Sequence, residues 1–306
     1  MEQMREDRTP HWQLHGLNTK TVFGLTCGVV SRTPRRVSYG IGHVSTWLAY
    51  HLMRQSTAAV VENLRVVFPE RSAAELRALA RETYHCYARD TIDFIRGLSM
   101  SKAQLTVHLS TVRGFDRMLA GGKGALLVAG HFGNWELGGL VLRTIFDFPL
   151  TVIGMPETDP DVDRMRRDLR ASHEIETLKV RQSADTALRI RRILAANEIV
   201  AMLADRPFGR DRVEVQFFGR PTGFLRTPAL MGYLTGAPLV PSFLLRQPDG
   251  RFSGYASDPI YVSRTGDRDA AVQAAMQAFA SVLETEVRKC PTLWYHFYPY
   301  WASADR

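Results

Sequence analysis

The sequence of 306 residues is poor in cysteine, and its three cysteines, Cys27, Cys86 and Cys290, lie far apart. They form no C-x-x-C pair and no even set, which argues against a disulfide scaffold or a zinc ribbon. No H-E-x-x-H or EF-hand pattern occurs, so no metal site is expected. The sequence also has no G-x-S-x-G elbow, which argues against a serine hydrolase.

Long apolar runs are missing as well. Val22 to Val30 and Ile41 to Met53 are apolar, but Ser31 to Arg36, which contains three arginines, separates them. A membrane-spanning helix needs about 20 consecutive apolar residues, and arginine is costly inside hydrocarbon. We therefore expect an interfacial or buried helical pair whose basic link suits anionic head groups. The first residues, Met1 to His11, do not resemble a signal peptide.

Acidic residues are fewer than basic ones, 31 against 39, which gives a formal net charge of +8. A basic surface indicates anionic partners: nucleic acid, acidic lipid head groups or an acidic carrier. A mildly basic soluble protein without any such partner would have the same composition.

The chain changes character near residue 112. Residues 17 to about 100 show helical periodicity, and Ser72 to Glu75 form a capping box. We expect residues 1–111 to form an N-terminal helical, membrane-associating region. Residues 112–306 alternate strand and helix patterns, which predicts an α/β core with a mostly parallel central sheet, covered by helices on both faces. The hairpin Leu239–Arg246 and Arg251–Ala256 should add an antiparallel pair at one edge.

The expected elements of the core are read from apolar periodicity and from turn residues. The predicted helices are Phe115–Leu119, Trp135–Ile145, Asp161–Ala171, Ser183–Asn197, Leu225–Thr235 and Asp269–Arg288. The predicted strands, besides the hairpin, are Ala125–Ala129, Leu150–Met155, Glu176–Val180 and Ile199–Ala204.

One strand-turn-helix corner carries the first candidate for chemistry. The strand Ala125–Ala129 ends just before His131, and Asn134 is placed to cap the next helix. His131 therefore lies at the carboxyl end of a strand, where open α/β sheets place their sites. Glu136 falls in the first turn of the helix, where a carboxylate also suits the helix dipole. On one continuous helix residues five apart point about 140° apart, so the two side chains can converge only across a turn.

A histidine titrates near neutrality, so His131 could act as a general base toward a hydroxyl. A carboxylate can fix its tautomer and stabilise the imidazolium. Asp205 follows the strand Ile199–Ala204 and would share the rim of a parallel sheet with His131. Either Glu136 or Asp205 could be the orienting acid, and the spacing does not choose. The structural alternatives are a packed histidine and a turn aspartate before Pro207.

Four arginines lie close together in the predicted helix Asp161–Ala171. Arg166 and Arg170 share one helix face, and Arg164 and Arg167 share another. Such a face can bind a phosphate or stabilise an oxyanion. A solvated charged surface is the ordinary alternative.

These motifs together resemble a known family. Gly130-His-Phe-Gly-Asn-Trp-Glu136 is similar to the H-x-x-x-x-E/D motif of the glycerolipid and lysophospholipid acyltransferase superfamily. Its surroundings resemble the bacterial late acyltransferases of lipid A biosynthesis, the lauroyl and myristoyl transferases. The resembling segments follow in the family's order over most of the chain: Asn63–Glu70, Asp205–Phe208, Val215–Pro221, Thr235–Pro241 and the aromatic segment around Trp294.

The resemblance implies roles for the candidate residues. His131 would activate an acceptor hydroxyl that attacks an acyl thioester. Glu136 matches the acid of the motif, and Asp205 matches a second acidic position that some members use beside the histidine. Arg170 matches the family's arginine after the motif, with Arg167 as an alternative in register. That arginine would stabilise the thioester oxyanion or a substrate phosphate.

The resemblance also implies the reaction, an O-acyl transfer that needs neither a metal, another cofactor nor a covalent acyl-enzyme. The donor would be acyl carrier protein or acyl coenzyme A, and the acceptor a glycolipid, with a lipid A precursor as first candidate. A lysophospholipid or a phosphatidylinositol mannoside is the alternative acceptor. Asn134, Arg164 and Arg167 are expected to contact substrate.

The expected location is the cytoplasmic face of the bacterial inner membrane, where the protein would be bound peripherally to an anionic surface, without nucleic acid. The competing hypothesis from another class is a non-catalytic protein that binds anionic lipid or nucleic acid through its basic surface.

Overall fold

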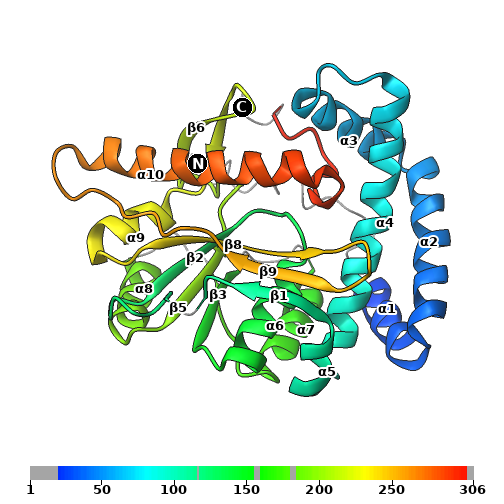
Figure 1. Cartoon of the computed structure of the whole chain (residues 1–306), viewed down its shortest axis with the longest axis horizontal. Coiled ribbons are helices and arrows are strands. Elements are labelled where there is room, and N and C mark those ends of the chain that lie inside the picture. Colours follow the sequence, from blue (N-terminus) through cyan, green and yellow to red (C-terminus); the bar gives the residue numbers. More distant parts are fainter. Residues whose placement is uncertain (1–19, 116, 155–158, 180–183, 302–306) are drawn as a thin grey trace, which may run out of the picture.

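A computed structural model describes residues 20–115, 117–154, 159–179 and 184–301. The predicted N-terminal helical region begins the described chain, and its helices run up to the first strand (Figure 1). The capping box at Ser72 is confirmed, since its hydroxyl accepts from the Glu75 amide and the Glu75 side chain bonds back to Ser72. The helices are α1 Lys20–Arg32, α2 Arg35–Leu52, α3 Arg54–Val67, α4 Ala73–Gly97 and α5 Lys102–Val107.

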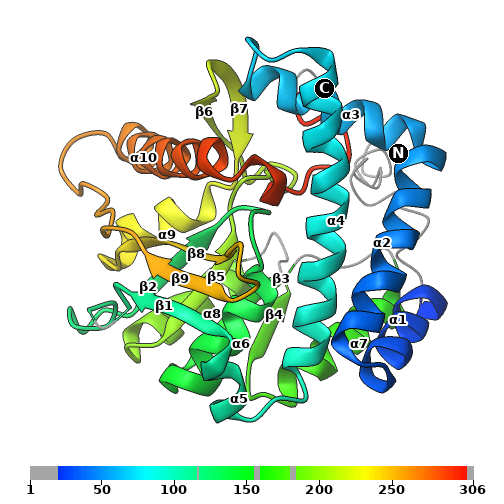
Figure 2. The same cartoon turned by 45° about the vertical axis from the view of Figure 1, so that its right-hand side comes forward.

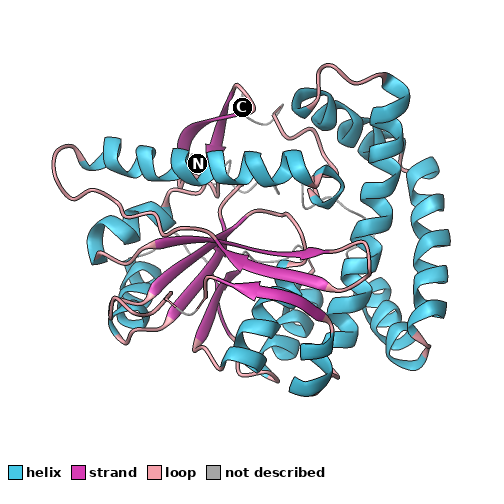
Figure 3. Ribbon diagram, in the orientation of Figure 1, coloured by secondary structure: helices cyan, strands magenta, loops and turns pink. Residues whose placement is uncertain are grey.

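The expected α/β core with a mostly parallel sheet is confirmed. Seven strands pair in the order β1-β9-β8-β2-β5-β3-β4. Figure 3 shows the strands in magenta, with the helices around them in cyan. All neighbouring pairs are parallel except β8 with β9, which form the predicted antiparallel hairpin. The strands are β1 Leu109–Arg113, β2 Ala125–Ala129, β3 Leu150–Gly154, β4 Glu176–Lys179, β5 Ile199–Leu203, β8 Leu239–Arg246 and β9 Phe252–Ala256.

Helices cover both faces of this sheet, as predicted. Successive residues of β2 point to opposite faces and all five are buried. Leu126 and Val128 belong to a core that includes residues of α8, α9 and α10, whereas Leu127 packs with Leu142 of α6. The core helices are α6 Trp135–Phe146, α7 Pro160–Ala171, α8 Ala184–Ala195, α9 Thr227–Thr235 and α10 Arg268–Lys289, followed by the short 3₁₀ helix η2 Pro291–Leu293.

Some details of the expected topology are wrong. The antiparallel hairpin does not form the edge, because β1 pairs in parallel with β9 outside it. Strand β1 was not predicted, because most of its five residues are exposed and its sequence shows no alternation of apolar and polar residues. It also spans the boundary expected between residues 111 and 112, and the division into two regions stays a proposal.

Two other local structures differ from expectation. The described residues of Phe115–Leu119 end in hydrogen-bonded turns and not in a helix. A second, two-stranded sheet joins β6 Val213–Phe217 to β7 Arg220–Phe224. Its turn places Phe218 and Gly219 at positive φ, and β7 contains proline and glycine, which weaken a strand pattern. The outer ends of the predicted elements at Met155, Val180 and Ser183, and the start Met1 to His11, lie outside the described residues.

Within the described ranges, no helix combines the length and the apolar composition that crossing a bilayer requires. Helix α2 packs on α4 and lies outermost, with α4 between it and the sheet (Figures 1 and 2).

Candidate active site

The fold brings the ends of two neighbouring strands together. β2 and β5 are parallel and in register, with Ala129 opposite Leu203. The chain continues from β2 into His131 and from β5 into Asp205, so both residues lie at the carboxyl edge of the sheet. The shared rim expected for these two residues follows directly from this pairing.

Asp205 is the acid bound to the catalytic candidate. The Nδ1 atom of His131 donates to Oδ1 of Asp205 over 2.7 Å, and the backbone N of His131 donates to Oδ2 over 2.8 Å. The Asp205 side chain is fully buried, whereas that of His131 is 18% exposed. A buried carboxylate on Nδ1 fixes the imidazole so that Nε2 serves for proton transfer.

A second histidine, not foreseen from the sequence, supports Asp205 from behind. The Nε2 atom of buried His296 donates to Oδ2 of Asp205 over 3.0 Å, and its Nδ1 accepts from the Tyr298 hydroxyl over 3.1 Å. The Tyr300 hydroxyl donates to the backbone carbonyl of Asp205. The aromatic C-terminal segment is therefore the support of the site, held to it also by the Tyr295 amide, which donates to the His131 carbonyl.

The electrostatics agree with a charged aspartate and a neutral second histidine. Burial alone would raise the pKa of the Asp205 carboxyl, but the interactions with His131 and His296 outweigh burial and hold this pKa well below its ordinary value. Burial, together with the nearby charge of Arg206, lowers the pKa of His296 to about 3. His296 therefore acts near neutral pH as an uncharged donor.

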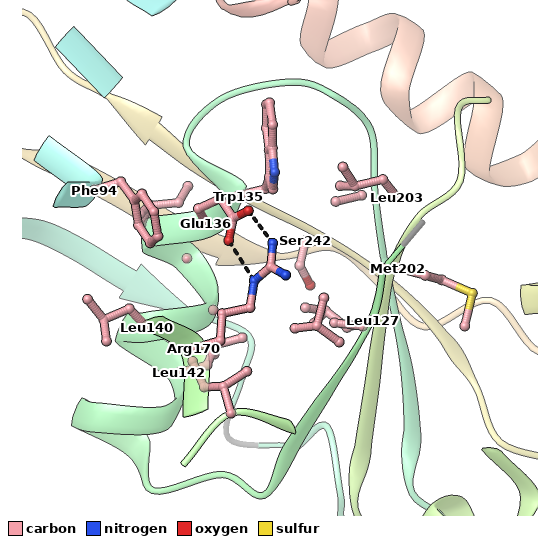
Figure 4. Close-up of a pocket in the computed structure, with 18 of the residues that line it drawn as sticks. Phe94, Leu127, Trp135, Glu136, Leu140, Leu142, Arg170, Met202, Leu203 and Ser242 are labelled. Carbon is pink, nitrogen blue, oxygen red and sulfur yellow. Dashed lines mark hydrogen bonds and ion pairs between the residues drawn. The ribbon is translucent and has the colours of Figure 1, made fainter. Parts of the chain in front are cut away.

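Glu136 binds arginines. Its carboxylate accepts from Nε of Arg170 over 3.1 Å and also from Nη2 of that residue, and Nη1 of Arg166 lies 3.8 Å from it. Figure 4 shows the side chains of Glu136 and Arg170 pointing toward one another inside the pocket. Burial opposes ionisation of Glu136, but the charge and hydrogen bonds of Arg170 lower its pKa overall.

The predicted split of the arginine helix is confirmed. Arg166 and Arg170 line the cavity, whereas Arg164, which pairs with Asp161, and Arg167, which pairs with Asp163, do not. The side chains of Arg164 and Arg167 are 64% and 40% exposed. Of the two registers left open by the resemblance, Arg170 is the one at the site.

Asn134 is the predicted cap of α6 and has structural partners. Its Oδ1 accepts from the Leu137 amide over 3.2 Å, and its Nδ2 donates to the backbone carbonyl of Asp90 over 2.9 Å. The residue is 4% exposed. We therefore interpret Asn134 as the residue that fixes the start of α6, in place of the expected substrate contact.

A cavity of about 320 Å³ lies beside His131, between α6 and the sheet. The polar groups His131, Glu136, Arg166 and Arg170 line it. Apolar side chains from both layers also line it, among them Phe94, Leu127, Leu140 and Leu142 (Figure 4). The hydrogen-bonded pair of His131 and Asp205, here termed the dyad, thus adjoins an apolar channel.

His131, Asp205 and His296 also place three metal-ligating atoms within 4.8 Å of one another. Hydrogen bonds of 2.7 and 3.0 Å join the two imidazoles to the carboxylate of Asp205 between them. The arrangement orients an imidazole, as general-base catalysis requires.

Comparison with known proteins places this site in a family. A family model described as bacterial lipid A biosynthesis acyltransferase matches residues 17–303. The chain belongs to that family. Curated relatives of this acyltransferase include the phosphatidylinositol mannoside acyltransferase of Mycobacterium tuberculosis, 29% identical over 74% of this chain and 71% of the relative. The enzyme of that name from Mycolicibacterium smegmatis is 27% identical over 74% of this chain and 73% of the relative.

Among solved structures, the 1-acyl-sn-glycerophosphate acyltransferase PlsC from Thermotoga maritima is similar to this acyltransferase at a TM-score of 0.39. It is 13% identical, over 86% of this chain and 100% of that chain. A likeness this distant does not bear on the activity.

The supporting residues of this acyltransferase were the hardest to foresee. His296 lies in the aromatic segment Trp294–Tyr298, whose apolar character predicts packing. In the sequence, the sign of a special role is a titratable residue in the middle of that aromatic run. In the structure this histidine is 1% exposed. Buried titratable groups need a partner, and this one has Asp205.

Proposed function

We propose that this acyltransferase moves a fatty acyl chain from an acyl thioester to a hydroxyl of a glycolipid, with His131 as general base. The observation that carries the proposal is the hydrogen-bonded pair of His131 and Asp205 at one end of an apolar cavity. A charged aspartate behind the imidazole favours proton uptake at Nε2. An apolar channel favours a substrate with a long hydrocarbon chain.

In the proposed mechanism, Nε2 of His131 takes the proton of the acceptor hydroxyl as its oxygen attacks the thioester carbonyl. The negative charge passes to the carbonyl oxygen of a tetrahedral intermediate. When the intermediate collapses, the carbon–sulfur bond breaks, the thiolate leaves and His131 returns the proton to sulfur. Asp205 stabilises the imidazolium in between, and His296 holds Asp205 in place.

Glu136 has a positioning role in this proposal. Its carboxylate accepts hydrogen bonds from Arg170 and lies 3.8 Å from Nη1 of Arg166. Guanidinium groups bind phosphate and oxyanions through charge-assisted hydrogen bonds. We propose that Glu136 orients Arg170 toward a phosphate of the substrate or toward the developing oxyanion, and that Asp205 alone orients the histidine.

The acceptor has two candidates, each supported by a comparison. A lipid A precursor is favoured by the family description, and a phosphatidylinositol mannoside is favoured by the curated relatives. The donor is acyl carrier protein or acyl coenzyme A, and both are anionic, in keeping with the net charge of +8. Lipid mass spectrometry of a strain that lacks the gene decides between the acceptors, because the substrate class loses one acyl chain.

The decisive test of the chemistry is His131→Ala. We expect the purified variant to retain the wild-type circular dichroism and melting temperature but to lose acyl transfer. Turnover at the wild-type rate would refute the base mechanism. Binding of anionic vesicles or nucleic acid without any transfer by the wild type would favour the non-catalytic hypothesis. Treatment with a chelator should leave transfer unchanged, since the proposed mechanism uses no metal.

We further propose that the protein binds peripherally to the membrane through α2. Its exposed apolar residues recur at helical spacing along one side, so they form a continuous stripe, and exposed arginines flank both ends of the helix. Apolar residues beside basic ones are typical of helices that lie in an anionic interface. The stripe consists of Val37, Ile41, Val44, Leu48 and Leu52, each between 46% and 69% exposed.

Co-sedimentation with vesicles of phosphatidylcholine and phosphatidylglycerol tests this attachment. The double variant Val44→Asp and Leu48→Asp should stay in the supernatant. Leu234→Asp is the matched control, because Leu234 is an exposed apolar residue, 53% accessible, on α9. Equal sedimentation of the double variant and the wild type would exclude α2 as the contact.

A further inference from the structure

The side of α6 that faces the cavity has an unusual composition. Trp135, Gly138, Gly139 and Leu142 recur at the spacing i, i+3, i+4 and i+7, so they form one stripe along the helix. All four line the cavity. Two adjacent glycines therefore occupy the middle of a stripe that large apolar side chains usually fill. Glycine inside a helix is also destabilising relative to alanine.

Neither glycine is required by the backbone. Both have helical conformation and neither has a positive φ. A Cβ atom at Gly138 would lie 3.5 Å from Cβ of Leu244, and one at Gly139 would lie 3.6 Å from Cδ2 of Leu150, both ordinary contacts. By contrast, a Cβ at Gly97 of α4 would lie 2.8 Å from Cδ1 of Leu137, so that side chain would have to shift.

The space beside the two glycines belongs to the cavity. On another side of α6, Leu137 packs against Leu105 in a buried cluster. Gly138 and Gly139 remain partly accessible although their helix is packed on the sheet, because their surface faces the channel. The sheet contributes large residues such as Leu127 and Met202 to the lining, besides small ones such as Ala129. On α6 the two glycines leave space between Trp135 and Leu142.

We propose that Gly138 and Gly139 determine the length of the acyl chain that the enzyme accepts, by keeping the channel open for a long, unbranched hydrocarbon. The inference rests on the proposed acyl transfer and adds its specificity. A leucine at either position adds four carbon atoms to the wall, a volume comparable to several methylene groups of the chain. Long acyl chains would no longer fit into the channel, whereas short chains would end before the added side chain and would still bind.

The test compares Gly139→Ala, Gly139→Leu and Gly138→Leu with the wild type on coenzyme A thioesters from decanoyl to stearoyl. We expect the ratio of kcat/KM for stearoyl over decanoyl transfer to fall by about tenfold or more in the leucine variants, and by less in the alanine variant. Gly24→Ala is the matched control. Gly24 lies in α1, its added Cβ would lie 3.8 Å from Cε of Met165, an ordinary contact, and it does not line the cavity. It should leave the ratio unchanged.

A second measurement separates the inference from the proposed function. Equilibrium binding of free decanoate and stearate needs no acceptor and no turnover, and the leucine variants should lose affinity for stearate selectively. Gly139→Ala should also melt at or above the wild-type temperature, since it removes a helix-interior glycine. Folded leucine variants with the wild-type chain-length profile would overturn the inference. A wild type that binds stearate but transfers no acyl group would overturn the proposed function instead.

Discussion

Replacing Asp205 by asparagine removes one charge from the site while it nearly preserves the shape of the side chain. The carboxylate accepts hydrogen bonds from the side chain and amide of His131 and from His296. An amide keeps one acceptor oxygen, so its nitrogen must face one of these donors or force a change of tautomer. The orienting partner of His131 is then either lost or reversed, and the imidazolium that forms during transfer has no counter-charge.

The size of the effect follows from the geometry. Two unit charges about 4 Å apart at an effective dielectric constant of about 20 interact by about 4 kcal/mol. The direct hydrogen bond of 2.7 Å puts the two groups in this range, and the fully buried carboxylate is little screened by salt. Since about 1.4 kcal/mol corresponds to a factor of ten in rate, kcat should fall by about a thousandfold.

The assay is transfer of a labelled palmitoyl group to acceptor lipid in vesicles, with kcat and KM measured separately. Acceptor-independent hydrolysis of the thioester, in which water replaces the hydroxyl, serves as a second readout. Glu136→Gln is the matched control, a charge-removing change in the same pocket. It should act mainly on KM, because Glu136 holds arginines and not the base. A folded Asp205→Asn enzyme within about threefold of the wild-type kcat, or a larger kcat loss in Glu136→Gln, would refute the assignment.

Two further outcomes follow from the same site. Arg170→Ala should lower kcat/KM by about a hundredfold, because it removes a partly buried, charge-assisted contact beside the dyad. Arg164→Ala should lower kcat/KM less than twofold, since exposed ion pairs contribute little. Equal effects of the two variants would contradict the assignment of Arg170, and not Arg164, to the site. The pKa of His296 is lowered from 6.5 to about 3. Between these pH values the histidine is protonated in the unfolded chain but not in the folded one. The free energy of unfolding should therefore fall as pH drops from about 6.5 toward 3. His296→Gln should flatten this slope in urea unfolding, and an unchanged slope would show that other groups cause it.

Much of the secondary structure could be predicted, because residues within or next to each of these elements favour its conformation. The strand Ala125–Ala129 is a short apolar run that stops at glycine, and Asn134 caps the helix that follows, as the structure confirms. The start of the helix after Ser72 was predicted from its capping box, which is likewise local. Where local preference and tertiary structure disagree, prediction failed: β7 contains proline and glycine, and β1 is stabilised by pairing with β9.

The sequence by itself determined that a histidine follows a buried strand and that an acid and an arginine helix come later in the chain. It also placed the chain in its family through the order of these motifs. Which acid meets the histidine was decided only by tertiary structure. Glu136 is near in sequence but pairs with Arg170, whereas Asp205, 74 positions from His131, reaches it because β2 and β5 are neighbours.

The support of the dyad depends on tertiary structure even more strongly. His296 lies 91 positions from Asp205 and reaches it only after the C-terminal segment has packed against the core. The apolar channel likewise forms between α6 and the sheet, from residues that are scattered along the chain. Local patterns report the conformation of a segment, but contacts between distant segments depend on which strands pair and which faces pack, and no local preference encodes that choice.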